Sequence, residues 1–340
     1  MRALLSKQPG GPETLVLEDI AEPVPGPKEV RVAVHACAVN YPDLLIIQDL
    51  YQYKPPRPFA PGAEVAGVVD AVGEGVDKVR VGDRVLVSPV RSGMAEKAVG
   101  SCANCWKIPD AMPFDEAAAL MMTFGTSLHA LKDRAQLRSG ETLLVLGAAG
   151  GVGLAAVELG KAIGARVVAA ASSEEKLALA REHGADEGVQ YPLGPLDKTH
   201  ARALTDRIKA ACGADGAQVI YDAVGGDYTE AALRAIGWQG RHLVVGFPAG
   251  IPKLPLNLPL LKSCQIIGVF WGAFTARYPA LHAANVGALI ALYLDGRIRP
   301  AVTEHFPLAR GAEAIARLGA RQARGKVVVT MENIVSDTGP

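Results

Sequence analysis

The first part of the chain consists of short apolar runs that alternate with polar residues and are separated by turns. Runs such as "EVRVAVHACAVN" and "DRVLVSPV" are rich in β-branched residues, and segments such as "PVPGPK" and "GEGVDKVRVGD" lie between them. Alternation with a period of two, interrupted by Gly and Pro, is typical of β-strands. The pattern therefore predicts an all-β module before Asp115.

The apolar pattern changes near Asp115. The stretch "DEAAALMMTFGTSLHAL" has helical spacing, and from "ETLLVLG" to "CQIIGVFW" apolar strands alternate with helical stretches. Strands that alternate with helices in this way indicate βαβ units. We therefore predict an α/β fold with a parallel, doubly wound sheet.

The alternation ends after residue 272. Two helical stretches, "ALHAANVGALIALYLDG" and "ARGAEAIARLGARQA", lead to a last strand, "KVVVT". This tail is too small to bury a core of its own, so we expect it to return to the β-rich module. The predicted domains are a β-rich domain of residues 1–122 and 273–340 and a nucleotide-binding domain of residues 123–272.

The most specific motif follows the first strand of the α/β part. "LLVLGAAGGVG" has the A-x-G-x-x-G spacing of a dinucleotide fingerprint, with Gly150 and Gly153 at its last two positions. There Gly150 lets the backbone approach a pyrophosphate, Gly153 lets the helix pack close to the sheet, and the helix start offers free N–H groups. An ordinary Gly-rich turn is the alternative. The predicted contacts are Ala149, Gly150, Gly151 and Val152.

The end of the second strand indicates which dinucleotide binds. NAD enzymes usually place Asp or Glu there, but this chain has small residues that end in Ser172. Hydroxyl groups with Lys176 one turn on, and Arg181 further along, would accept a 2′-phosphate. The alternative is a capping box of Ser172 and Glu175 with Lys176 in solvent, and both interpretations can hold because a capped helix start still presents N–H groups to a phosphate. Glu174 and Glu175 count against a phosphate. The missing acid and the nearby ammonium group favour NADPH over NADH.

Composition narrows the functional classes. The 340 residues include 35 acidic and 35 basic ones, a balance that argues against nucleic acid or an anionic membrane as partner. We expect neither a secretory signal nor a membrane span, because no stretch has the required length and apolar character. Five cysteines with irregular spacing indicate reduced thiols and a cytoplasmic location.

One carboxylate, Glu64, stands in the otherwise apolar run "APGAEVAGVV". Burial of an ionised carboxylate is costly unless a partner compensates its charge. The partner is a metal, a substrate or a basic group of the chain itself.

Six motifs in order, "HACAVNYPDLL", "PGAEVAGVV", "VGDRVLV", "GMAEKAV", "AAGGVG" and "GKVVV", resemble the medium-chain dehydrogenase/reductase superfamily over nearly the full length. The resemblance implies a GroES-like β-rich catalytic domain and a Rossmann domain. In the zinc alcohol dehydrogenases of this superfamily, a Cys and a His bind catalytic zinc. Their places hold Asn40 and Ala63 here, the structural zinc lobe is missing, and Cys102-x-x-Cys105 has no second pair nearby. We therefore expect no metal.

Loss of the zinc ligands limits the chemistry. Without a Lewis acid, hydride transfer is easiest to acceptors whose product anion is delocalised, such as quinones and α,β-unsaturated carbonyls. The chain is most similar to the zinc-free quinone oxidoreductases related to ζ-crystallin, which implies NADPH-dependent reduction of a quinone. An NADPH-dependent enoyl thioester or alkenal and enone reductase is the alternative. A cofactor-binding protein with a structural or regulatory role is the non-enzymatic alternative.

The resemblance also suggests catalytic candidates. Asn40 would hydrogen-bond the acceptor's oxygen, unless it is only a turn residue, and Asp43 would orient that loop. Tyr51 fits where reductase relatives carry a tyrosine facing the nicotinamide. It would donate a proton or stack, and Tyr41 and Tyr53 compete for this role.

Further cofactor contacts are expected along the chain. Thr126 begins the family's linking helix near the nicotinamide, unless its hydroxyl only starts a helix. The family places Tyr191 beside the 2′-phosphate, with Ser172 and Lys176, and Arg321 would bind the phosphate unless it forms a surface ion pair. Ligands of open α/β sheets bind at the carboxyl ends of the strands. The residues expected there are Val224, Phe247, Phe270, Trp271 and Gly272.

Two apolar strands, "LVVGF" and "QIIGVFW", are predicted near one sheet edge and need cover. We therefore expect a homodimer that pairs through edge strands of the Rossmann domain. The other partner is a small-molecule quinone or enone-type acceptor.

Overall fold

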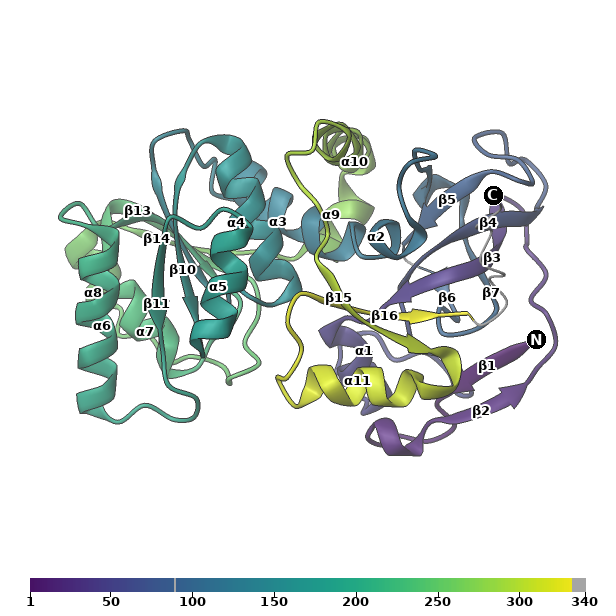
Figure 1. The fold of residues 1–340 in the computed structure, drawn as a ribbon, viewed down its shortest axis with the longest axis horizontal. Helices are drawn as coiled ribbons and strands as arrows, with labels where there is room; N and C mark the ends of the chain where they lie inside the picture. The colour runs from purple at the N-terminus through teal and green to yellow at the C-terminus, as the bar shows by residue number, and fades with distance from the viewer. Residues whose placement is uncertain (89, 332–340) are drawn as a thin grey trace. The chain divides into compact units, whose positions relative to one another are not determined.

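The chain forms two compact units, seen in a computed structural model that describes residues 1–88 and 90–331 (Figure 1). Unit 1 contains residues 1–122 and the segment from Pro300 onward, and unit 2 contains Thr123–Arg299. The first boundary coincides with the one expected from the sequence, but residues 273–299 lie in unit 2 rather than in the first domain. They belong there because Asn285 accepts a hydrogen bond from Lys132 Nζ at 2.7 Å and the Phe274 ring stacks on His129.

Unit 1 is built on an eight-stranded sheet with the order β15-β16-β3-β4-β5-β8, in which β7 pairs with β3 and β6 with β7. Its strands are β3 (Glu29–Ala38), β4 (Glu64–Val72), β5 (Arg84–Val87), β6 (Val90–Arg91), β7 (Lys97–Ser101), β8 (Cys105–Lys107), β15 (Val302–Pro307) and β16 (Lys326–Thr330). A separate hairpin joins β1 (Arg2–Leu5) and β2 (Val16–Asp19). The α-helices are α1 (Tyr41–Ile47), α2 (Phe114–Ala118) and α11 (Gly311–Gly319).

The alternating pattern of β3 explains the core of unit 1. Val30, Val32 and Val34 point into one cluster of buried side chains, and the residues between them are less buried. The last strand, β16, pairs antiparallel with β3, with Val328 opposite Ala38. Residues 302–330 therefore complete a sheet that residues 29–107 begin.

Unit 2 contains a six-stranded parallel sheet with the order β11-β10-β9-β12-β13-β14. This is the doubly wound order of a dinucleotide-binding fold, with the first strand at the centre and the order reversing there. The strands are β9 (Thr142–Leu146), β10 (Arg166–Ala171), β11 (Glu187–Gln190), β12 (Ala217–Asp222), β13 (Ile236–Val244) and β14 (Gln265–Gly268).

Helices cover both faces of the parallel sheet, with α4 and α5 over one face and α6 and α7 over the other (Figure 1). All five residues of β9 are buried, as expected for a strand covered on both sides. The helices are α3 (Thr126–Leu128), α4 (Gly151–Ile163), α5 (Glu174–Glu182), α6 (Lys198–Cys212), α7 (Asp227–Leu233), α8 (Asn257–Lys262), α9 (Trp271–Arg277) and α10 (Pro279–Leu294). Two π-helical turns, Met121–Gly125 and His129–Arg134, flank α3.

Candidate functional site

The fingerprint turn has the close packing that its glycines predict. Gly147 has φ 72°, Gly150 is the N-cap of α4, and α4 starts at Gly151. A Cβ on Gly153 would lie 2.1 Å from the Gly147 carbonyl oxygen, so only glycine lets the helix approach the strand there. A Cβ on Gly150 would meet nothing closer than 3.5 Å. The space beside Gly150 is therefore open on the side where the fingerprint needs room for a pyrophosphate.

The strand register brings the carboxyl ends of the parallel strands to one edge. Leu146 lies opposite Asp222, Asp222 opposite Val244, and Val244 opposite Gly268. Ligands of doubly wound sheets bind at this edge. The predicted residues that follow these strand ends are Ala149, Ser172, Tyr191, Val224, Phe247 and Phe270.

Asp222 fixes the turn after β12. Its Oδ1 accepts from the backbone N–H groups of Val224 at 3.0 Å and Gly225 at 2.9 Å. Its Oδ2 accepts from Thr229 Oγ1 at 2.6 Å and faces His242 Nε2 at 3.3 Å. Burial opposes ionisation, but these hydrogen bonds, with His242 foremost, hold the pKa of Asp222 below its usual value. Our sequence reasoning missed this residue, although an acid that directly ends a buried strand was a visible signal.

Close backbone approach brings the turns after β12 and β13 together. Gly225 has φ 75°, and a Cβ there would lie 2.4 Å from Phe247 Cβ. The Val224 carbonyl accepts from the Ala249 N–H at 2.9 Å. Val224 and Phe247 therefore lie side by side at the carboxyl edge of the sheet, and Phe247 is half exposed.

The helix around Thr126 is joined to the fingerprint turn and to Trp271. Ser127 Oγ donates to the Val152 carbonyl at 2.9 Å and lies 2.8 Å from the Tyr221 hydroxyl. A Cβ on Gly125 would lie 2.9 Å from the Trp271 ring, so the indole packs against the residue before Thr126. Ser127 was not among the predicted residues, because its partners lie far away in the sequence.

Ser172 and Lys176 meet at the end of β10. Lys176 Nζ donates to Ser172 Oγ at 3.2 Å. The cap of α5 is Ser173, whose hydroxyl accepts from the Lys176 backbone N–H at 3.3 Å. The alternative capping box begun by Ser172 is therefore wrong, and the Ser172 hydroxyl is bonded to an ammonium group at the end of β10.

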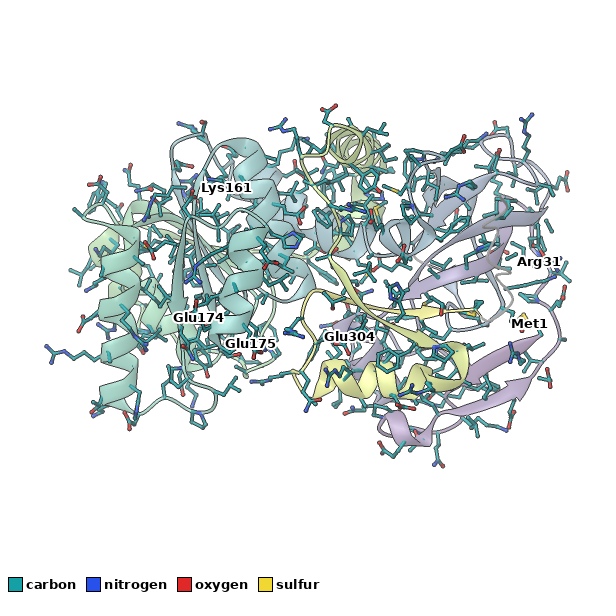
Figure 2. All side chains as sticks on the ribbon, viewed as in Figure 1. Met1, Arg31, Lys161, Glu174, Glu175 and Glu304 are labelled. Carbon is teal, nitrogen blue, oxygen red and sulfur yellow. The ribbon has the colours of Figure 1, made fainter. Side chains whose placement is uncertain are left out.

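Acidic residues stand at the first turn of α5, where Figure 2 labels Glu174 and Glu175. Glu174 bonds Arg181, so that guanidinium is engaged within the helix. Tyr191 follows β11 and is buried, with its ring centroid 4.9 Å from that of Tyr228. Arg181 is thus paired with an acid of its own helix, whereas Lys176 is bonded to Ser172, the residue between β10 and α5 that was also predicted to contact the 2′-phosphate.

In unit 1, Glu64 is paired with a lysine of the last strand. Glu64 is 1% exposed and Lys326 4% exposed, and Lys326 Nζ lies 3.2 Å from Glu64 Oε1. Lys326 Nζ also donates to Asn40 Oδ1 at 2.8 Å and to the Val39 carbonyl at 3.0 Å. Of the three partners considered for Glu64, which were a metal, a substrate and a basic group of the chain, the structure shows the basic group. Lys326 stands in the motif "GKVVV", but the pairing could not be predicted because the two residues are 262 positions apart.

The Asn40 amide is held on every side. Nδ2 donates to Glu64 Oε1 at 2.8 Å and to the Ala38 carbonyl at 3.3 Å, while Oδ1 accepts from Lys326. Both amide protons are therefore used inside unit 1.

Asp43 fixes the start of α1. Its Oδ2 accepts from the Asn40 N–H at 2.8 Å, and its Oδ1 accepts from the Gly62 N–H at 3.1 Å. Gly62 has φ 98°, a conformation that favours glycine. Burial raises the pKa of Asp43 to about 6, although both N–H donors and Lys326 favour the charged form.

Tyr51 lies near this group. Burial, followed by the charge of Asp43, raises the pKa of Tyr51. Its competitors Tyr41 and Tyr53 are 37% and 62% exposed. Arg321, also in unit 1, has φ 57° and follows α11 in a turn where its N–H donates to the Leu318 carbonyl at 3.0 Å.

Two family models match the chain in sequence. The alcohol dehydrogenase GroES-like domain matches residues 26–126, and the zinc-binding dehydrogenase model matches residues 151–285. A quinone oxidoreductase-like protein 2 from Bos taurus is 38% identical over 94% of this chain and 89% of its own length. The chain belongs to the medium-chain dehydrogenase/reductase superfamily. Human quinone oxidoreductase is 33% identical over 92% of each chain, which confirms the predicted branch.

Solved structures agree with this membership. A mycobacterial protein complexed with NADPH has a TM-score of 0.89 and 29% identity, over 97% of this chain and 100% of its own. A probable oxidoreductase from Mycobacterium abscessus has a TM-score of 0.85 and 34% identity, over 97% and 98%. The chain is therefore a nicotinamide-dependent oxidoreductase with a GroES-like domain and a Rossmann domain, as predicted, and it acts on a small molecule.

The donor set of this oxidoreductase does not fit the catalytic zinc that one family model is named for. Asn40 and Ala63 occupy the places of the Cys and His ligands, and the Asn40 amide is already bonded. Across residues 1–88 and 90–331, no three His, Cys, Asp or Glu side chains form a group suited to a metal ion. In the same residues, no helix is long and apolar enough to cross a membrane.

Proposed function

We propose that this oxidoreductase transfers a hydride from NADPH to a quinone. The choice of NADPH rests on the hydrogen bond between Lys176 Nζ and Ser172 Oγ at the carboxyl end of β10, where NAD enzymes place an acid. An ammonium and a hydroxyl there would bind a 2′-phosphate by charge-assisted hydrogen bonds. The NADPH complex of the mycobacterial neighbour supports the same choice.

The acceptor is proposed from chemistry and from the relatives. NADPH, when bound, supplies the hydride. A quinone that receives it becomes a hydroquinone anion whose charge is spread over the ring, so no metal is needed to hold that charge. A relative named quinone oxidoreductase, at 33% identity, and one named quinone oxidoreductase-like protein 2, at 38%, support this class of acceptor.

Residues of the Rossmann domain would hold the cofactor. The N–H groups of Ala149, Gly151 and Val152 at the start of α4 would bind the pyrophosphate, which Gly150 would admit beside it, since its own N–H donates to the Gly147 carbonyl at 3.0 Å. Thr126, which follows the Gly125 that packs against the Trp271 ring, would contact the nicotinamide end. The further contacts proposed in this domain are Tyr191, Val224, Phe247, Phe270 and Gly272, and Arg321 of the GroES-like domain would bind the phosphate.

In the GroES-like domain, Tyr51 is the proposed donor to the acceptor's oxygen. We assign Asn40 to positioning, because both of its amide protons are used by Glu64 and Ala38. Asp43 holds the start of α1 and Gly62 through two backbone N–H groups, and so orients the segment that leads to Tyr51. The main contributions of the chain are then orientation and exclusion of water.

A homodimer through the Rossmann domain remains our proposal. In the described part of the parallel sheet, β14 is one of the two edge strands and β13 lies one strand inward, which corrects the expectation for "LVVGF". Exposed apolar side chains accompany that edge: Ile266 on β14, and Leu256, Leu260 and Leu261 around α8. We also keep the cytoplasm as the proposed location, because all five cysteines are free thiols.

Stopped-flow oxidation of NADPH and NADH with a panel of quinones, enones and enoyl thioesters tests this function. We expect quinones to give the highest kcat/KM, with NADPH preferred. A value of about 10⁴ M⁻¹s⁻¹ or more would exclude a purely structural or regulatory role. Turnover of an enoyl thioester without turnover of any quinone would replace the proposal by double-bond reduction.

A further inference from the structure

The chain passes between its two units twice, and a buried carboxylate holds the last backbone N–H before each passage. Before the first passage, the Met122 N–H donates to Glu64 Oε2 at 2.7 Å. Before the second, the Arg299 N–H donates to Glu158 Oε2 at 2.6 Å. We call these two contacts the Glu64 clamp and the Glu158 clamp. One belongs to each unit, so each unit fixes one end of the connection.

Each clamping carboxylate is itself fixed through its other oxygen. Glu64 Oε1 accepts from Asn40 Nδ2 and Lys326 Nζ. Glu158 Oε1 bonds His183 Nδ1 at the end of α5. A carboxylate that accepts a backbone N–H makes a stronger bond than a neutral acceptor does. Both clamps are therefore rigid attachments within their own unit.

The second passage is also held by its neighbours. The Arg297 side chain bonds the Ala162 carbonyl near the end of α4, and Ile298 is buried. Pro300, which follows Arg299, has no N–H to donate. Glu158 thus receives the final N–H of this segment.

The Glu158 clamp shares α4 with a proposed cofactor contact, and the Glu64 clamp is bonded to the residue that starts α1. Glu158 lies on α4, and the start of α4 is the proposed pyrophosphate site. Glu64 bonds Asn40, the residue that starts α1, and Met122 precedes the helix that contains Thr126. A shift of either passage would therefore move a group that orients cofactor or acceptor.

We propose that Glu64 and Glu158 are positioning residues, which hold the two passages of the chain and thereby set the rate of hydride transfer without touching either substrate. The proposal rests on the proposed function. Small displacements of reacting groups slow a reaction strongly, by as much as about 100-fold for 1 Å. We expect NADPH affinity to change much less, because neither carboxylate is a proposed contact of the cofactor.

The test compares variants of the clamps by single-turnover hydride transfer, NADPH binding and amide hydrogen exchange. We expect Glu158→Ala to slow hydride transfer at saturating substrates about tenfold, with the NADPH dissociation constant within about twofold. The Arg299 amide should exchange at least about tenfold faster in this variant, because it loses its acceptor. The Met122 amide should be unchanged.

Substitution by glutamine should affect the two clamps differently. In Glu158→Gln, the amide oxygen can accept from Arg299 while the NH₂ group donates to His183, so we expect a rate within about twofold of the unsubstituted protein. In Glu64→Gln, three donors from Asn40, Lys326 and Met122 meet a single oxygen. Hydride transfer should therefore slow, and the Met122 amide should exchange faster.

Asp186→Ala is the matched control. Asp186 also accepts a backbone N–H, from Val167 at 2.7 Å, and pairs with Lys161, which Figure 2 labels on α4. It lies just before β11, and its partners Val167 and Lys161 belong to neither passage, so its loss should leave the hydride transfer rate within about twofold. If Glu158→Ala slowed transfer no more than Asp186→Ala despite faster exchange at Arg299, the clamps would only support the fold and the proposal would be refuted.

Unchanged exchange at Arg299 in Glu158→Ala would also refute the proposal. Failure of the proposed function gives a different result, since the unsubstituted protein would then oxidise no NADPH with any acceptor. In that case the positioning role in hydride transfer falls with the function, while faster exchange in the variants would still report the two contacts.

Discussion

Asp43 is a carboxyl group whose surroundings oppose its charge. Burial raises its pKa from 3.8 to about 6, so the folded protein binds a proton that the unfolded chain releases between these values. The stabilising contribution is complete below about pH 4 and is lost as the pH rises through about 6. Asp43 thus acts opposite to a carboxylate in a favourable ion pair.

We predict that Asp43→Asn removes this part of the pH dependence. Between about pH 4 and pH 7, the unsubstituted protein should lose about 3 kcal/mol of unfolding free energy relative to the variant, as the size of the pKa shift implies. Urea unfolding at several pH values measures the difference. Parallel profiles for the two proteins would show that Asp43 does not titrate in this range.

Lys176 allows a second prediction at the level of one side chain. Loss of its ammonium in Lys176→Ala should raise KM for NADPH about 10- to 100-fold and leave KM for NADH nearly unchanged, because only NADPH carries the 2′-phosphate. Arg181→Ala is the control, since Glu174 already binds that guanidinium. Equal effects of Lys176→Ala on both cofactors would contradict the assignment.

Single residues were predictable from the sequence where their partners are close in the chain. Gly150, Gly153, Ser172 and Lys176 lie within one βαβ unit, and a local motif was enough to single them out. The need of Glu64 for a partner was also visible, but Lys326 was not, because only the assembled sheet brings β16 next to the start of α1.

The fingerprint turn makes a prediction about one element with a matched pair of glycines. Gly153→Ala places a methyl group 2.1 Å from the Gly147 oxygen, so α4 must shift, and we expect a loss of about 1–3 kcal/mol in unfolding free energy. Gly150→Ala has room in the protein itself and has φ −82°. It should change stability by less than about 0.5 kcal/mol.

The same pair separates stability from cofactor binding. Because the space beside Gly150 is the proposed place of the pyrophosphate, Gly150→Ala should weaken NADPH binding at least about tenfold, measured by fluorescence titration. Denaturant unfolding gives the stabilities. Unchanged NADPH affinity in Gly150→Ala would move the pyrophosphate away from this turn.

Strands and helices followed from periodicity where burial is regular, as in β3 and β9. The π-helical turns around α3 did not, because their extra residues depend on packing that the sequence pattern does not record. The helical spacing of "DEAAALMMTFGTSLHAL" is correct as a helical region but covers four segments, which are α2, α3 and the two π-helical turns. The edge position of β14 rather than β13 likewise became visible only with the strand order.

For the whole molecule, we predict a homodimer that buries the edge of the parallel sheet. Light scattering at micromolar concentration should give twice the chain mass. Leu260→Glu should produce monomers, because it adds a charge to a leucine that is 78% exposed on α8 beside this edge. Leu294→Glu, at an exposed leucine of α10, is the control and should stay dimeric. A monomeric unsubstituted protein would contradict the prediction.

The division of the chain shows the limit of sequence reasoning at the largest scale. The boundary near residue 122 was visible as a change from β pattern to α/β pattern. The second boundary was placed at 273, because the alternation of strands and helices ends there. Residues 273–299 stay with unit 2 through contacts such as Lys132 with Asn285, which a periodicity cannot reveal.

The ion pair between Glu64 and Lys326 joins two residues that a ribosome makes far apart in time. A ribosome makes the carboxylate early and its lysine 262 residues later. Until β16 emerges, Glu64 has no ammonium partner, and β3 lacks the neighbour that β16 provides. A fragment that stops before β16 therefore contains most residues of the first unit but lacks the lysine that pairs with Glu64. Completion of the GroES-like domain thus reports that translation has passed through the whole Rossmann domain.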